Sequence, residues 1–487
     1  MNADEIKNKK LIESRLFDFL AEENEVCEMD PNQLLTPNLF DLAIKLSYLR
    51  HKNIAPNFSN KIYSDHLIAF GGGGFHEPEK PGKNSLKSFL SEFHLILQSI
   101  EDNGFNENES IIPLARDGSI LNGAHRVAAA IYLGQTVKAI KLNVNPSNYG
   151  YDFFVERHTP WYTLLSGLQE FMRRSPNLRV AVYWPRASNS VDYRPANIIA
   201  EYVAELTFKE FSGFVRQVYR AEPWLGNPSN NYHGALHKAR NCYVEGAPLK
   251  VVVFLTEPDE DLLQIKQSVR NKLNIGKHAL HISDHIQDTQ QVINFIFNAN
   301  SKNFLMLEEP SRFPKKDKKV QVVFDALLSV GADPYKNAID SGCVLEIYGL
   351  REAFDIDAIS IDSEKNINIL KDFGVDNHNG AFHQNGLLVN EIICDPEKHF
   401  WYGGIKFVSL EILREFKKRR GEEKDIKDVD LIDSLLKQSK WSLKKAILKQ
   451  RLFYFKYSLF RKSRRFIVEV LKILGAFSFV KKLLGKK

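Results

Sequence analysis

The chain has 487 residues, which is enough for roughly two to four domains of ordinary size. Its content of 44% hydrophobic and 26% charged residues is that of a globular protein, so a disordered chain is not expected. The four cysteines are dispersed without a CxxC pair, which argues against a disulfide framework and a structural zinc site and fits a reducing cytosol.

Helices followed by a segment with strands are predicted in the first 150 residues, and the fold class expected for the chain is α/β (α+β), with a first domain at 1–150. Residues 1–60 have the apolar spacing of helices, and 70–83 form a loop rich in Gly and Pro. An amphipathic helix is predicted at 85–101. A strand, a turn, a helix and a second strand are predicted within 111–142.

A candidate anion site lies in the segment 111–142, which reads IIPLARDGSILNGAHRVAAAIYLGQTVKAIKL. Asp117 begins a tight turn, and the alanine-rich helix follows Asn122 and Gly123. Free N–H groups and the helix dipole favour an anion at such a helix start, and His125 and Arg126 add donors. An ordinary solvated helix start with an N-cap explains the same pattern equally well.

The DG-x-[hydrophobic]-x-x-G-x-x-R pattern, the alanine-rich helix and the LG after it resemble the ParB/sulfiredoxin superfamily over about 60–145. Members include ParB nucleotide-binding domains, sulfiredoxins and a free-serine kinase. The resemblance implies that Gly123, His125 and Arg126 contact a nucleotide phosphate, with Asn122 and Asp117 in the same site. Position 124 is Ala where sulfiredoxins carry their catalytic Cys, so sulfiredoxin chemistry is excluded.

The middle region, 151–310, is predicted to be an α/β domain of unknown role. Strands are expected at 179–184 and 249–255 and a helix at 286–298, and the charged segment 308–319 is expected to be a linker.

Two segments of the middle region contain several histidines each. A polar loop is expected at 222–243; it carries His233, His237 and Lys238 and is either a substrate or phosphate site or a plain surface loop. One helical face is expected to carry His278, His281 and His285, as a metal site or as ordinary loop histidines.

The third region, 320–438, carries an acidic pair. A helix is predicted at 320–330 and a buried strand at 343–348, followed by Asp355 and Asp357 on a second strand. Alternate residues of a strand share a face, so the two carboxylates could bind Mg²⁺ with substrate phosphates. An exposed strand with two solvated acids is the alternative.

Gly349 and Arg351 precede these acids, an arrangement that resembles the DNA-polymerase-beta-like nucleotidyltransferase fold. The resemblance implies that Asp355, Asp357 and Arg351 are catalytic, although the usual Gly-Ser pair is missing. The charged helix–turn–helix at 409–438 resembles a K-x-x-R-x(3–4)-KD-x-x-D segment of such families. Its candidate residues, with one lysine just before it, are Lys406, Lys417, Arg420, Lys424, Asp425 and Asp428. A salt-bridged helix surface is the alternative. Residues 376–383 and Asp395 are candidates for a third metal ligand.

The tail, 441–487, is strongly basic. It holds 14 Lys/Arg and one acid, whereas the rest of the chain holds 52 basic and 59 acidic residues. Its basic, aromatic and aliphatic residues predict a helix lying on an anionic membrane surface, since no apolar run is long enough to span. A helix packed on the protein's own body and a single-stranded nucleic-acid site are the alternatives. The polar start, MNADEIKNKK, has no apolar signal segment.

The sequence therefore predicts a nucleotide- and Mg²⁺-dependent phosphoryl or nucleotidyl transferase, with ATP or another nucleoside triphosphate and a glycan or small-molecule acceptor. It is expected in the cytoplasm, peripheral on the inner membrane. A weaker resemblance, centred on GIKFVSL, is to uncharacterised proteins of bacterial surface-polysaccharide biosynthesis. The alternative is a ParB-like, nucleotide-gated regulator that binds DNA or RNA without catalysis.

Overall fold

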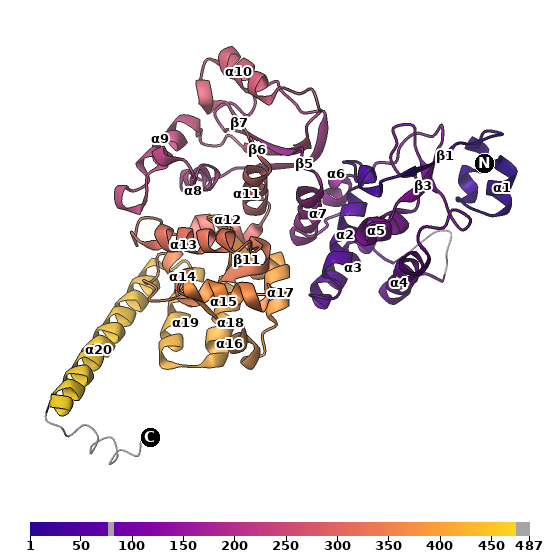
Figure 1. Cartoon of the computed structure of the whole chain (residues 1–487). Helices are drawn as coiled ribbons and strands as arrows, with labels where there is room; N and C mark the ends of the chain where they lie inside the picture. Colours follow the sequence, from indigo (N-terminus) through magenta and orange to yellow (C-terminus); the bar gives the residue numbers. More distant parts are fainter. Residues whose placement is uncertain (76–81, 474–487) are drawn as a thin grey trace.

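The computed structural model describes residues 1–75 and 82–473, with the backbone alone for 457–473 and for 364, 365, 367 and 369. Within these residues the chain is mixed α/β, and its strands form three sheets, each from a successive part of the sequence (Figure 1).

The N-terminal part is built on the sheet β1-β3-β2, in which β3 (Val137–Lys141) pairs antiparallel with β1 (Val26–Met29) and parallel with β2 (Ile112–Leu114). Its helical elements are α1 (Ala3–Asn8), η1 (Ser14–Phe19), η2 (Pro31–Leu34), α2 (Phe40–His51), α3 (Pro56–Phe70), α4 (Leu86–Asn103) and α5 (Ala124–Leu133). The helix predicted at 85–101 and the strand–turn–helix–strand at 111–142 are confirmed. Strand β1 was not expected in the helical segment, and part of the predicted 70–83 loop, 76–81, lies outside the described residues.

The middle part holds an antiparallel sheet with the order β5-β6-β4-β7. The strands are β4 (Leu178–Tyr183), β5 (Asn197–Ala204), β6 (Leu249–Leu255) and β7 (Leu280–Ile282). The helical elements are α6 (Tyr151–Glu156), α7 (Trp161–Arg174), α8 (Phe208–Val218), η3 (Pro223–Leu225), η4 (Pro228–Asn230), α9 (His233–Cys242), α10 (Leu262–Leu273), η5 (Gly276–His278), α11 (Ile286–Ile296) and α12 (Ala299–Leu307). The strands predicted at 179–184 and 249–255 and the helix at 286–298 are confirmed.

Two expectations for the middle part were wrong. The segment 222–243 is not a continuous loop, because its second half forms α9. The three later histidines do not share a helical face: His278 ends η5, His281 lies in β7 and His285 precedes α11.

The third part holds a mixed sheet with the order β10-β9-β8-β12-β11. Its strands are β8 (Asn337–Ile339), β9 (Ile356–Ser360), β10 (Val375–Asn377), β11 (His399–Tyr402) and β12 (Ile405–Val408). The helical elements are α13 (Lys316–Ser329), η6 (Pro334–Lys336), α14 (Ser341–Ile347), α15 (Glu364–Asp372), α16 (Asn379–Gln384), α17 (Val389–Cys394), η7 (Pro396–Lys398), α18 (Leu410–Arg420) and α19 (Glu423–Leu436). The charged helix pair predicted at 409–438 is confirmed as α18 and α19.

The strand predicted at 343–348 was wrong, because this segment belongs to helix α14. All seven residues of α14 are buried, so the helix shows no polar face. A short, fully buried helix and a buried strand have the same apolar sequence pattern, and only the packing distinguishes them.

The three parts pack against one another. A continuous apolar core includes side chains from all three sheets. Glu391 in α17 accepts hydrogen bonds from the backbone N–H groups of Asn57 and Phe58, which start α3. The segment expected to be a linker at 308–319 is anchored at its start, because Glu308 is buried and pairs with Arg216 of α8.

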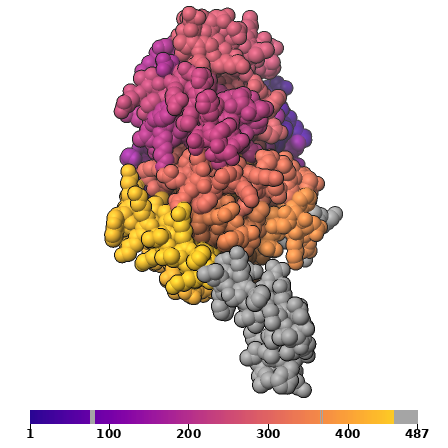
Figure 2. All heavy atoms as spheres, turned by 90° about the vertical axis from the view of Figure 1, so that its left-hand side faces the viewer, coloured from indigo at the N-terminus to yellow at the C-terminus, as the bar shows by residue number. Residues whose placement is uncertain are grey.

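Helix α20 (Lys440–Ile473) extends from the third part (Figure 1). Its first turns pack on α19, and Ala446 is buried there. The Gln450 side chain donates a hydrogen bond to Asp428. Figure 2 shows the C-terminal segment, coloured yellow, at the edge of the molecule. In the described residues, no helix has the length and apolar character needed to cross a bilayer. Residues 474–487 of the predicted tail lie outside the described residues.

Candidate functional site

A cluster of two carboxylates and one imidazole lies at one edge of the third sheet. Asp340 follows β8, Asp357 lies in β9 and His378 follows β10. The His378 Nδ1 atom is 3.3 Å from Asp340 Oδ2, and its Nε2 atom is 3.1 Å from Asp357 Oδ1. Within the described residues, these three side chains form the group whose ligand atoms all lie within 4.8 Å of one another.

Strand order brings these residues together. β9 lies between β8 and β10, so residues from three chain segments meet around Asp357. The backbone N–H of Asp340 donates to the Asp357 carbonyl oxygen at 2.9 Å, and Asp376 of β10 is the register partner of Asp357. Asp355 and Asp376 are exposed, and their charges act on Asp357. The cluster therefore has two buried carboxylates and a half-buried imidazole, with two exposed acids nearby.

The charge balance of the buried centre is unusual. Burial, together with the negative charge of Asp340, raises the pKa of Asp357 to about 7. Burial opposes protonation of His378, but its contact with Asp340 and the charges of both aspartates raise the pKa of this histidine. The two acidic neighbours therefore favour the protonated form of His378 against the effect of burial.

Hydrogen bonding in the centre is incomplete. Both carboxylate oxygens of Asp340 and the hydroxyl of Ser341 are buried and lack a hydrogen-bond partner among the described residues. The 3.3 Å approach of His378 to Asp340 is an ion-pair distance without hydrogen-bond alignment. A buried polar group without a partner costs roughly 1–3 kcal/mol, and a charged one costs more, unless a cation or water satisfies it. The site thus has unused capacity for a positively charged ligand.

The donor set fits a divalent cation. Asp340 and Asp357 offer carboxylate oxygens, which suit Mg²⁺ and Mn²⁺, and His378 offers an imidazole nitrogen, which suits Mn²⁺ and Zn²⁺. Of the acids expected to bind metal, Asp357 lies in the cluster, whereas Asp355 is exposed beside it and is not one of its three members. His378 comes from the segment 376–383, in which a third ligand was expected.

Asp340 was not among the expected ligands, because the turn before the acids was expected at Gly349. The structure places Asp340 between β8 and α14, with Ser341 and Gly342 as the first residues of the helix, while Gly349, with φ of 77°, follows the end of α14. The signal available in the sequence was Asp-Ser-Gly directly after a short apolar segment.

Arg351 is engaged elsewhere. Its guanidinium makes two hydrogen bonds, of 2.8 and 2.9 Å, to the carboxylate of Asp428 in α19. The Nζ atom of Lys417 is 2.8 Å from the same carboxylate, and Gln450 of α20 donates to it at 2.6 Å. Arg351 therefore fastens the segment before β9 to the helical layer, and its charge is already balanced.

The Lys/Arg/Asp pattern forms an internal ion-pair network rather than an open cationic surface. Lys417 and Arg420 both contact Asp425. Lys424 is exposed and pairs with Glu422 at 3.1 Å. These contacts agree with the alternative given for this segment, in which the charged residues of α18 and α19 pair with one another.

Lys406, expected to bind phosphate, is buried in β12. Its Nζ atom donates to the carbonyl oxygens of Tyr335 and Ile393, at 2.8 and 2.7 Å. Burial lowers the pKa of Lys406 to about 8. Its contacts are those of an internal lysine.

The start of α5 has a second distinct arrangement. Gly123 precedes the helix with φ of 97°, a conformation that favours glycine. A β-carbon there would lie 2.8 Å from Ile112 Cδ1 and 2.9 Å from Arg126 Nη2. Arg126 is half-buried over this turn, and its guanidinium has no hydrogen bond or ion pair with another described residue. A cation beside the free N–H groups of a helix start is suited to an anion.

The other residues expected around this helix start have different roles. His125 contacts the Tyr63 hydroxyl at 2.8 Å through Nε2 and packs edge-on against Phe93. Burial, and then the charge of Lys45, hold the pKa of His125 well below its usual range, so it is a neutral core residue rather than a cationic donor. Asp117 accepts hydrogen bonds from the N–H and hydroxyl of Ser119 and thus holds the turn, and Asn122 is half-buried beside it.

Comparison of the chain with models of protein families, with curated proteins and with solved structures found no match.

Proposed function

We propose that the protein is a divalent-cation-dependent transferase of nucleotidyl or phosphoryl groups, with Asp340, Asp357 and His378 as its cation-holding residues. The observation that carries this proposal is the buried carboxylate of Asp340, which lacks a hydrogen-bond partner among the described residues and faces Asp357 and His378. A bound divalent cation would neutralise phosphate oxygens and orient the transferred group. Asp355 and Asp376, which are exposed near the cluster, would contact the hydrated cation or the substrate.

The turn between β8 and α14 adds support from the resemblance to polymerase-beta-like nucleotidyltransferases. In such proteins a small-residue turn precedes the acidic strand, and here Ser341 and Gly342 stand at that position relative to Asp355 and Asp357. A β-carbon at Gly342 would lie 3.2 Å from Ala353 Cβ, so this turn packs closely on the segment that leads into β9.

The nucleotide-binding part of the proposal rests on Arg126 and Gly123 at the start of α5. An unpaired guanidinium next to a glycine turn can form a bidentate pair with a phosphate. The alternative, a regulator that binds a nucleotide without turning it over, would need the site at the start of α5 but not the carboxylate cluster. The carboxylate cluster favours the transferase.

The test is cation binding followed by turnover. We expect the full-length protein to bind Mn²⁺ in calorimetry and to consume a nucleoside triphosphate when Mg²⁺ or Mn²⁺ is present. Asp357→Asn should lose both while keeping the circular dichroism spectrum of the wild type. Turnover that survives chelation of all divalent cations would contradict the proposal.

We further propose that α20 holds the protein at an anionic membrane surface, as suits glycan assembly on the cytoplasmic face. Four apolar side chains, at helical spacing along one side of α20, are 52–72% exposed: Trp441, Leu448, Leu452 and Phe455. Basic residues flank them, including Lys445 and Lys449. An apolar stripe with basic borders is the pattern of a helix that lies in the headgroup region.

Deleting the whole of 441–487 would also remove Gln450, which hydrogen-bonds Asp428. A truncation of 457–487 spares this contact and still removes nine Lys/Arg and one acid. The intact protein should float with vesicles that contain phosphatidylserine, and the truncated form should float much less. Equal flotation of both forms, or flotation equally strong with uncharged phosphatidylcholine vesicles, would contradict an electrostatic membrane role.

A further inference from the structure

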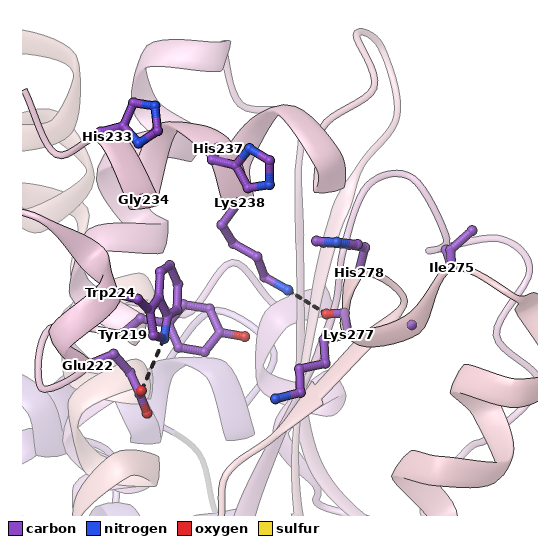
Figure 3. Close-up of a pocket in the computed structure, with 11 residues that line it drawn as sticks. Tyr219, Glu222, Trp224, His233, Gly234, His237, Lys238, Ile275, Lys277 and His278 are labelled. Carbon is purple, nitrogen blue, oxygen red and sulfur yellow. Dashed lines mark hydrogen bonds between the residues drawn. The ribbon is translucent and has the colours of Figure 1, made fainter.

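A pocket of about 760 Å³ opens in the middle part (Figure 3). Its walls come from the end of α8, the turn that contains η3, helix α9 and the loop before β7. The volume lies within the roughly 300–1,000 Å³ common for small-molecule sites. None of its lining residues belongs to the carboxylate cluster or to the start of α5.

The backbone that forms the pocket is held in one arrangement. Gly234 lies in the first turn of α9 against the η3 turn, and a β-carbon there would overlap the carbonyl oxygen of Trp224. Asn231 and Tyr232 both have positive φ, of 53° and 50°, directly before α9. The Tyr232 hydroxyl donates to Asp317 of α13 at 2.6 Å, which fixes this strained turn. The pocket is therefore preformed.

The polar wall is cationic. Lys238 of α9 is buried, and its ammonium points across the pocket to the carbonyl oxygen of Lys277 (Figure 3). The same ammonium also contacts the Cys242 thiol. An ammonium has three N–H donors, so these two partners leave one donor for a ligand. Lys277 and His237 are exposed on the same wall.

Little negative charge offsets these groups. Among the described lining residues the acid is Glu222, and its carboxylate accepts a hydrogen bond from the Trp224 indole at 3.0 Å. Burial is the main cause that lowers the pKa of His278, and the positive charge of Lys238 lowers it further. A ligand that enters this pocket gains most if it is an anion.

The opposite wall is aromatic. Trp224 is 45% exposed, and its ring centroid lies 5.2 Å from that of Tyr219 at an interplanar angle of 56°. Figure 3 shows both rings below the Lys238 side chain. An exposed, supported indole next to cationic groups is a platform on which a planar base or the apolar face of a sugar ring can stack.

We infer that this pocket binds a small phosphorylated ring compound, with the phosphate at Lys238 and Lys277 and the ring on Trp224. A nucleoside monophosphate and a sugar phosphate share this chemistry. The inference does not depend on the proposed transferase, because the two sites have no residue in common.

The experiment is calorimetry of the full-length protein with AMP, UMP, glucose 1-phosphate, glucose and inorganic phosphate. At least one phosphorylated ring compound should bind with a Kd below about 1 mM, and glucose and inorganic phosphate should bind at least about 10-fold more weakly. Binding of a nucleotide alone would identify a base on Trp224, and binding of the hexose phosphate would identify a sugar; either result supports the pocket. Absence of binding by every probe at about 10 mM would overturn it.

Matched variants assign the binding to this pocket. Trp224→Ala and Lys277→Ala change exposed side chains, and each should weaken binding at least about 10-fold. Trp441→Ala and Lys318→Ala, at exposed positions on α20 and α13, should leave the affinity unchanged. Nucleotide binding that resists both pocket variants but is lost in Arg126→Ala would belong to the start of α5 and would overturn the inference. Asp357→Asn should bind as the wild type does, which separates this result from the fate of the proposed transferase.

Discussion

The start of α5 and the carboxylate region use the same two residue types in opposite states. At α5, the pKa of His125 is held well below its usual range, and the Arg126 guanidinium makes no hydrogen bond or ion pair with another described residue, although the charge of Glu13 acts on it. In the third part, the pKa of His378 is raised by its contact with Asp340 and by the charges of Asp340 and Asp357, and Arg351 is paired with Asp428. One region has a guanidinium without a hydrogen bond to another described residue, and the other has a buried carboxylate, that of Asp340, whose oxygens lack a hydrogen-bond partner among those residues.

Burial alone does not explain this difference, because burial opposes the charged form of both histidines. What differs is the chemistry of the neighbours. His125 packs against Tyr63 and Phe93, and the charges that act on it are cationic, with Lys45 the strongest. His378 faces two carboxylates. The sign of the neighbouring charge therefore decides which ligand each region can accept, an anion at α5 and a cation at the carboxylates.

The largest expected effect concerns the two arginines. Arg351→Ala should lower the free energy of unfolding by about 3 kcal/mol, because it leaves a buried Asp428 with fewer partners. Arg126→Ala should cost less than about 1 kcal/mol, since it breaks no ion pair with another described residue. Urea denaturation of both variants measures the contrast. Equal losses would show that Arg126 has a structural role.

The next effect concerns the two classes of aspartate. Asp340→Asn should reduce cation-dependent turnover at least about 100-fold, or about 2.7 kcal/mol, because it removes a buried ligand. The matched variant Asp355→Asn changes an exposed acid and should reduce turnover less than about 10-fold. Rates at saturating Mn²⁺ give the comparison. A larger loss of turnover in the Asp355 variant than in the Asp340 variant would show that Asp355 and Asp357 are the main cation ligands.

A smaller effect is expected for nucleotide binding at α5. Loss of the Arg126 guanidinium removes one charge-assisted pair with phosphate, which should weaken ATP binding by about 1.5 kcal/mol, or roughly 10-fold. Calorimetry of Arg126→Ala at fixed salt measures this change, and Arg116→Ala, an exposed arginine that contacts Asn143, is the control. An unchanged ATP affinity in the Arg126 variant would remove the phosphate site from α5.

The smallest effect is the pH dependence of the two histidines. The pKa of His125 lies below the unfolded value near 6.5, so its contribution to stability is present above that pH and is lost as the pH falls through the folded pKa. The pKa of His378 is raised, so its contribution is present below 6.5 and is lost as the pH rises through the folded pKa.

Ring resonances followed by NMR in the presence of a chelator should therefore show His378 titrating at a higher pH than His125. The variants His125→Gln and His378→Gln identify the two resonances. If His125 titrated at the higher pH, the surroundings assigned to the two histidines would be wrong.

Local sequence determined several features of this chain. The sequence predicts an alanine-rich helix between Gly123 and Gly134, and α5 occupies this segment. The prediction succeeds because the backbone conformation of glycine and helix propensity are local properties. The alternating Asp355 and Asp357, the charged pair α18 and α19, and the basic composition of the tail were also readable, since each depends on spacing within a few turns.

Tertiary structure decided which of these residues meet. Asp340, Asp357 and His378 are separated along the chain and become neighbours only because β9 lies between β8 and β10. The pairing of Arg351 with Asp428, and the burial of every residue of α14, likewise depend on packing between distant segments. Charge state follows packing as well, because desolvation and the sign of neighbouring charges set a pKa, and neither can be read from one stretch of sequence.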